Sequence, residues 1–293
     1  RLPADSMVVK FEFFDKAGKL LATAASTDTN PTPAAGGFGG GGFGGGAPQV
    51  AKPSNRKGIN RYTWNMRHES AIVFRGMINW AGRGGAPAMA PGMYSVKMTV
   101  GSNTPVSYPF EVKPDPRSPA TVADLTEQTR FALQVRDRFT QANQGVIEIR
   151  NLKKDMTDRA PKMTANAAFG PLIKKFADSL SAVEDSIYQT KNQSGQDPLN
   201  YPIRLNDQMG GLMGFVMSGE RRPPKQAYDV YNVLGPKLDV QMARMERIIA
   251  ADLPKVNAAL KAAGVPEIKR SKVEAGGSGP AAAVFVPMEE SDR

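Results

Sequence analysis

The sequence predicts a mixed α+β protein in which strands come first and helices follow. Apolar and polar residues alternate in the first third of the chain, which is typical of half-buried strands. A proline-rich boundary follows, and beyond it apolar residues recur at three- and four-residue spacing. We therefore expect an immunoglobulin-like β-sandwich over 1–115, an antiparallel bundle of four long helices over 116–268, and a flexible tail over 269–293.

The strand pattern is plainest in three segments. The odd-numbered residues of 7–13 are apolar, and two alternating stretches within 94–112 flank a turn, as in a β-hairpin with one buried face. The segment 62–66 repeats the alternation and predicts a further strand. Pro109 falls on the polar face of the hairpin, which favours an edge strand because proline donates no backbone hydrogen bond.

The first predicted helix covers about 122–156. Thr121 and Asp124 resemble a capping box at its start. Two interleaved series of apolar residues recur every seven positions, which predicts packing against another long helix. The two series are Leu125, Ala132, Phe139 and Val146, and Val135, Ala142, Ile149 and Met156.

Three further apolar stripes predict the remaining helices. They run over 169–187, over 205–216 and over 234–260; Pro223-Pro224 opens the last helix and Gly264 ends it. Prolines at 236 and 254 are expected to bend or interrupt that helix.

A glycine- and phenylalanine-rich insertion occupies 31–58 of the predicted sandwich. Its composition is typical of a mobile loop, and no Lys-Ser/Thr or helix follows as a phosphate-binding loop would require. Exposed aromatic side chains in such a loop can anchor a partner, so Phe38 and Phe43 are candidate contacts. The alternative is an insertion with no specific role. The tail offers one further candidate contact, made by Val284, Phe285 and Val286.

Composition excludes several kinds of site. The chain has 293 residues, no cysteine and one histidine, so thiolate chemistry and an ordinary zinc site within one chain are excluded. We expect no cofactor, no metal and no catalytic residues. The net charge of +10 comes from scattered residues, which favours a solvated basic surface over a nucleic-acid site. No stretch is apolar enough for a transmembrane helix.

A few residues still invite a functional interpretation. His68 is the one candidate base, although a surface or loop histidine is the simpler interpretation. Glu127 and the pair Glu184-Asp185 could suggest a carboxylate metal site, but we interpret them as solvated acids paired with Lys and Arg. Trp64 and Trp80 are expected to be buried anchors, with carbohydrate binding as the alternative. The same choice, between core and an adaptable binding groove, applies to five methionines: Met209, Met213, Met217, Met242 and Met245.

Several segments are similar to a recurring bacterial pattern. They are Asn-Arg-Tyr-Thr-Trp-Asn-Met-Arg at 60–67, Gly-Met-Ile at 76–78, Ala-Pro-Gly-Met-Tyr-Ser-Val-Lys-Met-Thr-Val at 90–100, Val-Lys-Pro-Asp-Pro-Arg at 112–117 and Leu-Asn-Tyr-Pro at 199–202. The pattern resembles the C-terminal region of large secreted bacterial proteins with sortilin-like or BNR-repeat β-propellers. The first part also resembles the FlgD-like immunoglobulin-like domain. The resemblance covers roughly 5–268, and neither the glycine-phenylalanine insertion nor the tail follows it.

This resemblance implies an exported protein, periplasmic, cell-surface or secreted, whose propeller would precede Arg1. The chain starts without a leader and a strand follows almost at once, so we expect a piece of a longer polypeptide. Relatives are often labelled glycosyl hydrolases for their propeller repeats, but the Ser-x-Asp-x-Gly-x-Thr-Trp box of those repeats does not occur in this sequence.

We therefore expect a non-catalytic scaffold or protein-interaction module. Its partners would be an upstream propeller or other subunits of an assembly. One alternative is an accessory part of a glycan-active enzyme, which would need a pair of carboxylates in a concave pocket. A second alternative is binding of anions or nucleic acid by the basic surface, which would need a contiguous basic face.

Overall fold

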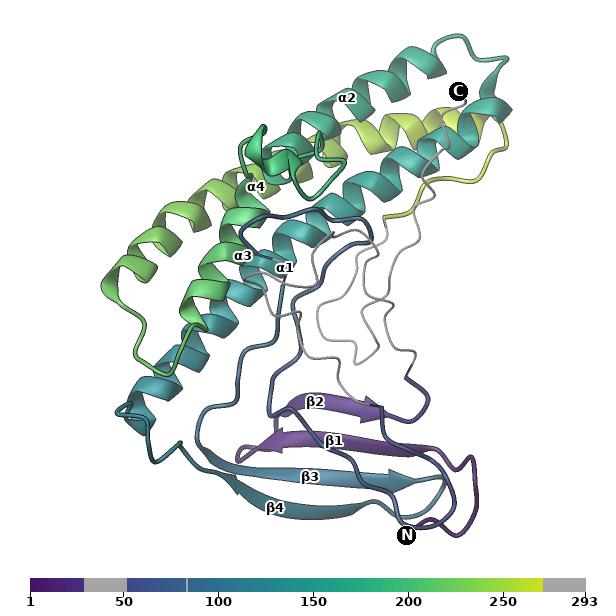
Figure 1. Ribbon diagram of the computed structural model, residues 1–293. Coiled ribbons are helices and arrows are strands. Elements are labelled where there is room, and N and C mark those ends of the chain that lie inside the picture. The colour runs from purple at the N-terminus through teal and green to yellow at the C-terminus, as the bar shows by residue number, and fades with distance from the viewer. Residues whose placement is uncertain (29–51, 83, 271–293) are drawn as a thin grey trace.

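The computed structural model describes residues 1–28, 52–82 and 84–270. A small antiparallel sheet lies at one end of a long set of helices, and helix α1 runs away from it (Figure 1). The four strands stand in the order β2-β1-β3-β4. Their bounds are β1 Val9–Asp15, β2 Leu20–Ala25, β3 Gly92–Val100 and β4 Val106–Val112. The predicted mixed fold, with strands before helices, is confirmed.

The sheet is made of two hairpins joined through their first strands. β1 pairs with β2 across a turn in which Gly18 takes a φ of 81°, and β3 pairs with β4 across a turn with Gly101 at 56°. The centre of the sheet is the antiparallel pair β1 and β3, with Phe13 opposite Val96. Pro109 lies on β4, which is an edge strand as predicted.

The two faces of the sheet differ in chemistry. On one face Phe11 stacks on Tyr62 with ring centroids 4.9 Å apart, and Phe13 stacks on Trp64 at 3.9 Å. On the other face Glu12 lies between two lysines, with its carboxylate 3.0 Å from Lys10 Nζ and 2.9 Å from Lys97 Nζ. One face is therefore covered by aromatic side chains, and the other carries an ion-pair network.

The layer that covers the apolar face is not a second sheet. The predicted strand at 62–66 is wrong, because this segment is irregular and Met66 takes a positive φ of 52°. Aromatic stacking, rather than a ladder of backbone hydrogen bonds, holds it to the sheet. Its cover stops near Phe110, so Val106 and Tyr108 of the predicted buried face are 44% and 56% exposed. Among the described residues there is one four-stranded sheet, and an immunoglobulin-like sandwich of two sheets is not seen.

The four helices lie where the apolar spacing predicts them. Their bounds are α1 Val122–Arg159, α2 Phe169–Ile187, α3 Leu205–Val216 and α4 Lys225–Ala262, with 3₁₀ turns η1 Ala160–Met163 and η2 Asp197–Leu199. The capping box of Thr121 and Asp124 is present, and every member of the two heptad series of α1 is buried. Prolines 236 and 254 do not interrupt α4, since both lie on its exposed side, where water can bond the freed carbonyls.

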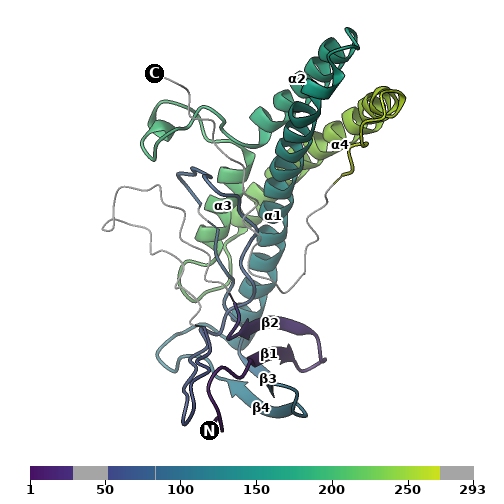
Figure 2. The same cartoon turned by 90° about the vertical axis from the view of Figure 1, so that its right-hand side faces the viewer.

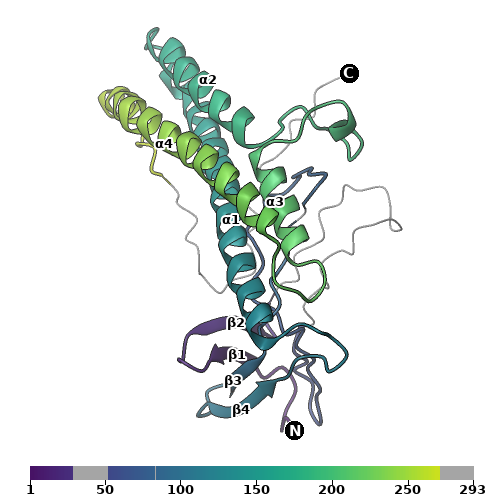
Figure 3. The same cartoon turned by 90° about the vertical axis from the view of Figure 1, so that its left-hand side faces the viewer.

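The arrangement of the helices differs from the predicted antiparallel four-helix bundle. α1 and α4 run parallel, because Glu127 bonds Tyr228 and Arg138 bonds Asp239 at the same offset along the chain. α2 and α3 follow one another along this pair, so that three helices rather than four pack together at each level (Figures 2 and 3). The chain between them, 188–204, breaks what would otherwise be one long antiparallel helix.

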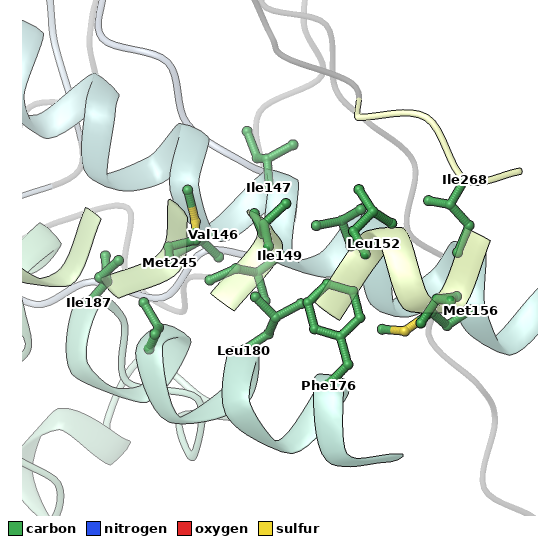
Figure 4. Close-up of a cluster of buried hydrophobic side chains, with 14 of the residues drawn as sticks. Val146, Ile147, Ile149, Leu152, Met156, Phe176, Leu180, Ile187, Met245 and Ile268 are labelled. Carbon is green, nitrogen blue, oxygen red and sulfur yellow. The ribbon is translucent and has the colours of Figure 1, made fainter. Parts of the chain in front are cut away.

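The helices share a core in two parts. The larger part joins α1, α2 and α4 through side chains such as Ile149, Phe176 and Met245 (Figure 4). The smaller part joins α1, α3 and α4 around Phe139 and Met209. Three of the five methionines considered for a groove are almost fully buried, and Met217 and Met242 pack against the two clusters. The core interpretation of these methionines is confirmed.

The two tryptophans provide a matched test of the aromatic cover. Replacing Trp64 by Ala removes the stack on Phe13 and the edge contact with Phe110, and should lower the free energy of unfolding by about 2–4 kcal/mol. Trp80 has a side chain that is 54% exposed, so W80A should change stability by less than about 0.5 kcal/mol. Urea denaturation followed by circular dichroism measures both. Equal losses in the two variants would contradict the stacking role of Trp64.

Candidate functional site

A hairpin-like segment, residues 67–82 and 84–89, leaves the sheet and returns to it after reaching the helices; we call it the arm (Figure 1). Its two legs are joined by backbone bonds, from His68 N to Pro87 O at 2.9 Å and from Ala71 N to Gly85 O at 3.1 Å. A single β-bridge links Arg67 to Ala88. The arm therefore has few hydrogen bonds between its own backbone groups. Side chains of the helices bond several of its remaining backbone groups.

The ascending leg is held by polar side chains of α1. Ile72 donates its N–H to Thr140 Oγ1 at 3.2 Å and accepts from Asn143 Nδ2 at 2.8 Å. Asn206 of α3 donates in turn to Asn143 Oδ1 at 3.1 Å. Asn143 and Asn206 are completely buried, so the amide groups that these bonds join would be costly to leave unpaired, although Asn206 Oδ1 accepts no hydrogen bond from the described residues.

The tip of the arm is fixed by Asp207, which lies in the first turn of α3. Its carboxylate accepts the backbone N–H groups of Trp80, Ala81 and Gly82 at 2.8, 2.7 and 3.1 Å. The side chain is buried, and burial raises the pKa of Asp207 while the three N–H donors act in the opposite direction. A negative charge at a helix N-terminus is also favourable to the helix dipole.

Next to this carboxylate the two backbones touch. A β-carbon placed on Gly82 would lie 1.9 Å from the carbonyl carbon of Gly210, and one on Gly210 would lie 2.9 Å from Cα of Gly82. Neither position has room for a side chain. Neither Asp207 nor this contact was predicted from the sequence, although two adjacent glycines in a predicted helix were a signal of close backbone approach.

A second anchor lies where α2 ends. Ile78 donates its N–H to the hydroxyl of Tyr188 at 3.0 Å, and the ring of Phe74 packs edge-on against Tyr188. The guanidinium of Arg150 lies over both rings and bonds the carboxylate of Glu184 at 2.7 Å. Glu184 is buried and forms an interhelical pair, so its interpretation as a solvated acid is wrong.

The other candidate carboxylates are held in ordinary pairs. Arg130 and then Tyr228 lower the pKa of Glu127 to about 2 by hydrogen bonding, against the effect of burial. Asp185 accepts from the hydroxyl of Thr190. Within 1–28, 52–82 and 84–270 no three acidic or histidine side chains come together as a possible metal site.

His68 lies in the first leg of the arm and is partly buried. Burial, followed by the positive charges of Arg136 and Lys19, lowers the pKa of His68 to about 4, against the opposite effect of Asp137 and Asp15. The imidazole is therefore neutral at pH 7. No nucleophile is bonded to it among the described residues, which agrees with a loop histidine.

Two shallow hollows border α4, one lined by α4 alone and the other by α4 and Ser179 of α2. One, of about 250 Å³, is lined by Asp229, Val230, Val233 and Leu234. The other, of about 440 Å³, is lined by Ser179, Arg244, Arg247, Ile248, Ala251 and Asp252. The first is apolar and the second is basic, and neither contains a pair of unpaired carboxylates.

The five residues predicted as partner contacts, Phe38, Phe43, Val284, Phe285 and Val286, lie outside the described residues. Trp64 is stacked on Phe13 but only partly buried, and Trp80 is 54% exposed and is therefore not the expected buried anchor. In the described part of the chain no helix is both long and apolar enough to cross a membrane.

Comparisons with known proteins add no relative: the chain matches no family model, no curated protein and no solved structure.

The single histidine makes the pH dependence of stability testable. Because the folded state lowers the pKa of His68 from 6.5 to about 4, its stabilising contribution is complete above pH 6.5 and is lost as the pH falls through 4. The free energy of unfolding of the wild type should fall by about 1–2 kcal/mol more than that of H68Q between pH 7 and 4, after allowance for solvent screening. Urea titrations at a series of pH values measure this difference. Parallel curves for the two proteins would show that His68 titrates normally.

Proposed function

We propose that this chain is a non-catalytic scaffold or protein-interaction module that holds its sheet in a fixed orientation to a long set of helices. The observation that carries the proposal is the docking of the arm at the break between α2 and α3. Three backbone N–H groups of the tip converge on Asp207, and the backbones of Gly82 and Gly210 are in direct contact. Such a junction fixes the tip of the arm on the helices, and the arm in turn is continuous with the segment that covers the sheet.

The use of the buried polar groups supports this proposal. Asn143, Asn206 and Asp207 are buried, and their side chains bond the arm or each other. Groups of this kind in a cleft would instead be candidates for binding or catalysis. Here their hydrogen bonds hold one part of the chain against another.

Export and a propeller partner belong to the same proposal, and their support is the sequence resemblance. The segments that carry it fall on framework positions: 60–67 covers the sheet and enters the arm, 76–78 lies at the tip, and 92–100 is the central strand β3. We propose that the module works outside the cytoplasm as part of a propeller protein or of a larger assembly. The sheet would brace the propeller, and the helices would present a long surface.

Isolation from the native source tests the partner. Intact mass and peptide mapping of the protein and whatever co-purifies with it should show propeller peptides in the same polypeptide or the same complex. Recovery of the chain alone, free of any other polypeptide, would contradict the proposed assembly.

Rigid coupling is tested by distance measurements between the two parts. The chain has no cysteine, so S107C on β4 and A182C on α2 introduce two specific sites for spin labels. Double electron–electron resonance should give a narrow distance distribution in the otherwise wild-type chain. G82A should broaden it, because the added carbon would overlap the backbone of Gly210. D207A should broaden it as well and lower the free energy of unfolding by about 3 kcal/mol, since three buried donors lose their acceptor.

G85A is the matched control in the same arm. Its added carbon would meet only the end of the Met217 side chain, at 3.4 Å, and should leave the distribution narrow. Circular dichroism confirms that the helices remain folded in each variant. A broad distribution in the unmodified chain, or no effect of G82A and D207A, would refute rigid coupling.

A further inference from the structure

One side of α4 presents a continuous exposed stripe that the core does not use. Its members follow one another at three- and four-residue spacing, so they lie on the same face of the helix. They are Val230, Val233, Lys237, Val240, Arg244, Arg247 and Ala251. The two hollows described above lie along this stripe, the apolar one near its start and the basic one near its end.

The two halves of the stripe differ in chemistry. Val230 and Val233 are 45% and 54% exposed, and Val240 is 60% exposed. Arg244 and Arg247 form no ion pair with any residue of the described part, because Asp252 in the same hollow is paired with Lys255. The stripe therefore offers three exposed valines, with Lys237 among them, followed by the two positive charges of Arg244 and Arg247. A second copy of the same helix in parallel orientation would bring these charges close to one another, which opposes self-association in that orientation.

One segment of the chain itself has the complementary pattern. Residues 284–292 read Val-Phe-Val-Pro-Met-Glu-Glu-Ser-Asp, an apolar triplet followed by three acids. Their formal charge is −3, whereas the whole chain carries +10. Along the stripe the valines come before the arginines, and along this segment the apolar triplet comes before the acids. The two charge patterns are therefore complementary when both run in the same direction.

The spacing of the two patterns also agrees. From Val233 to Arg244 the helix rises about 17 Å at 1.5 Å per residue. From Phe285 to Glu290 an extended chain spans about 17 Å at roughly 3.3 Å per residue. An extended segment that places its phenylalanine on the valines thus brings its first acids to the arginines.

The point at which the described chain stops allows this contact. Arg270 bonds Glu246 of α4 at 2.7 Å and Glu148 of α1 at 2.6 Å, which fixes the chain at the level of Glu246. Val230 lies about 24 Å from that level along the helix. The thirteen residues 271–283 can span up to about 45 Å. This length suffices to reach the start of the stripe and to pass round the helix.

We propose that residues 284–292 bind along the exposed face of α4 within the same chain, with Val284, Phe285 and Val286 on the apolar hollow and the acidic residues at Arg244 and Arg247. The short glycine-rich connection gives the segment a high effective concentration at this face, so weak contacts suffice. This inference does not rest on the proposed scaffold function.

Distance measurements on the full chain test the contact. Spin labels at N232C, on the exposed side of α4 next to the apolar hollow, and at M288C should give a short, well-defined distance. The double variant R244E/R247E should reduce the short-distance fraction about three- to tenfold, and F285A should do the same. Combining R244E/R247E with E289R/E290R should restore it. K174E/K175E, an equal charge change on the exposed side of α2, is the control and should have no effect.

Dilution of the labelled chain with unlabelled protein distinguishes binding within one chain from binding between two copies. The short distance should persist when the doubly labelled chain is diluted into unlabelled protein. If it arises only between separately labelled N232C and M288C chains, the face binds a second copy and the assignment within one chain is wrong. A broad distribution that neither the arginine variants nor F285A changes would also overturn the proposal.

Discussion

At Gly82 the arm meets Gly210 of α3 backbone to backbone, and this contact sets the position of much else in the structure. With no side chain between them, the tip of the arm comes close enough for Asp207 to accept three successive N–H groups. Successive N–H groups that point to one anion make a concave site of the kind that usually binds phosphate. Here the anion is a side chain of the same protein, so the site is filled from within.

The arm also explains why α2 and α3 are separate helices. Its tip enters between the end of α2 and the first turn of α3. At the end of α2 the hydroxyl of Tyr188 accepts the N–H of Ile78, and in the first turn of α3 Asp207 accepts the N–H groups that begin at Trp80. Phe74 joins the larger part of the helix core and Ala71 joins the smaller one. A continuous antiparallel helix would fill this space. The break at 188–204 and the arm are therefore two aspects of one packing solution.

Much of the helical part could be predicted because its signal is local. The heptad series of α1 depends only on spacing, and all of its members are buried as expected. Spacing does not encode direction, however, and so α1 and α4 were wrongly expected to fit an antiparallel bundle. The arm could not be predicted at all, because its bonds go to side chains far away in the sequence. A strand was wrongly predicted at 62–66 for a related reason. Side chains that stack on a sheet from an irregular segment show the same apolar-polar alternation as a strand.

The energetic roles in the junction are divided between two kinds of contact. The buried rings of Phe74 and Tyr188 and the residues around them supply most of the favourable free energy, since burial of apolar area is the larger contribution. The polar contacts of Asn143 and Asp207 each contribute about 1 kcal/mol net, yet leaving one unpaired costs about 1–3 kcal/mol. These polar contacts therefore determine which position the arm takes on the helices, and they add little to the free energy of unfolding.

The order of the segments along the chain has a consequence for folding. The arm precedes the helices that receive it, and Asp207 is synthesised more than a hundred residues after Gly82. The central strand pair also forms late in synthesis, because β3 follows the arm in the sequence and β1 can pair with it only after the arm has been synthesised. During synthesis the arm therefore has no binding site until α3 exists, and its long-range contacts form late. A chain built in this way folds at the pace of its most distant contacts rather than of its rapidly formed helices.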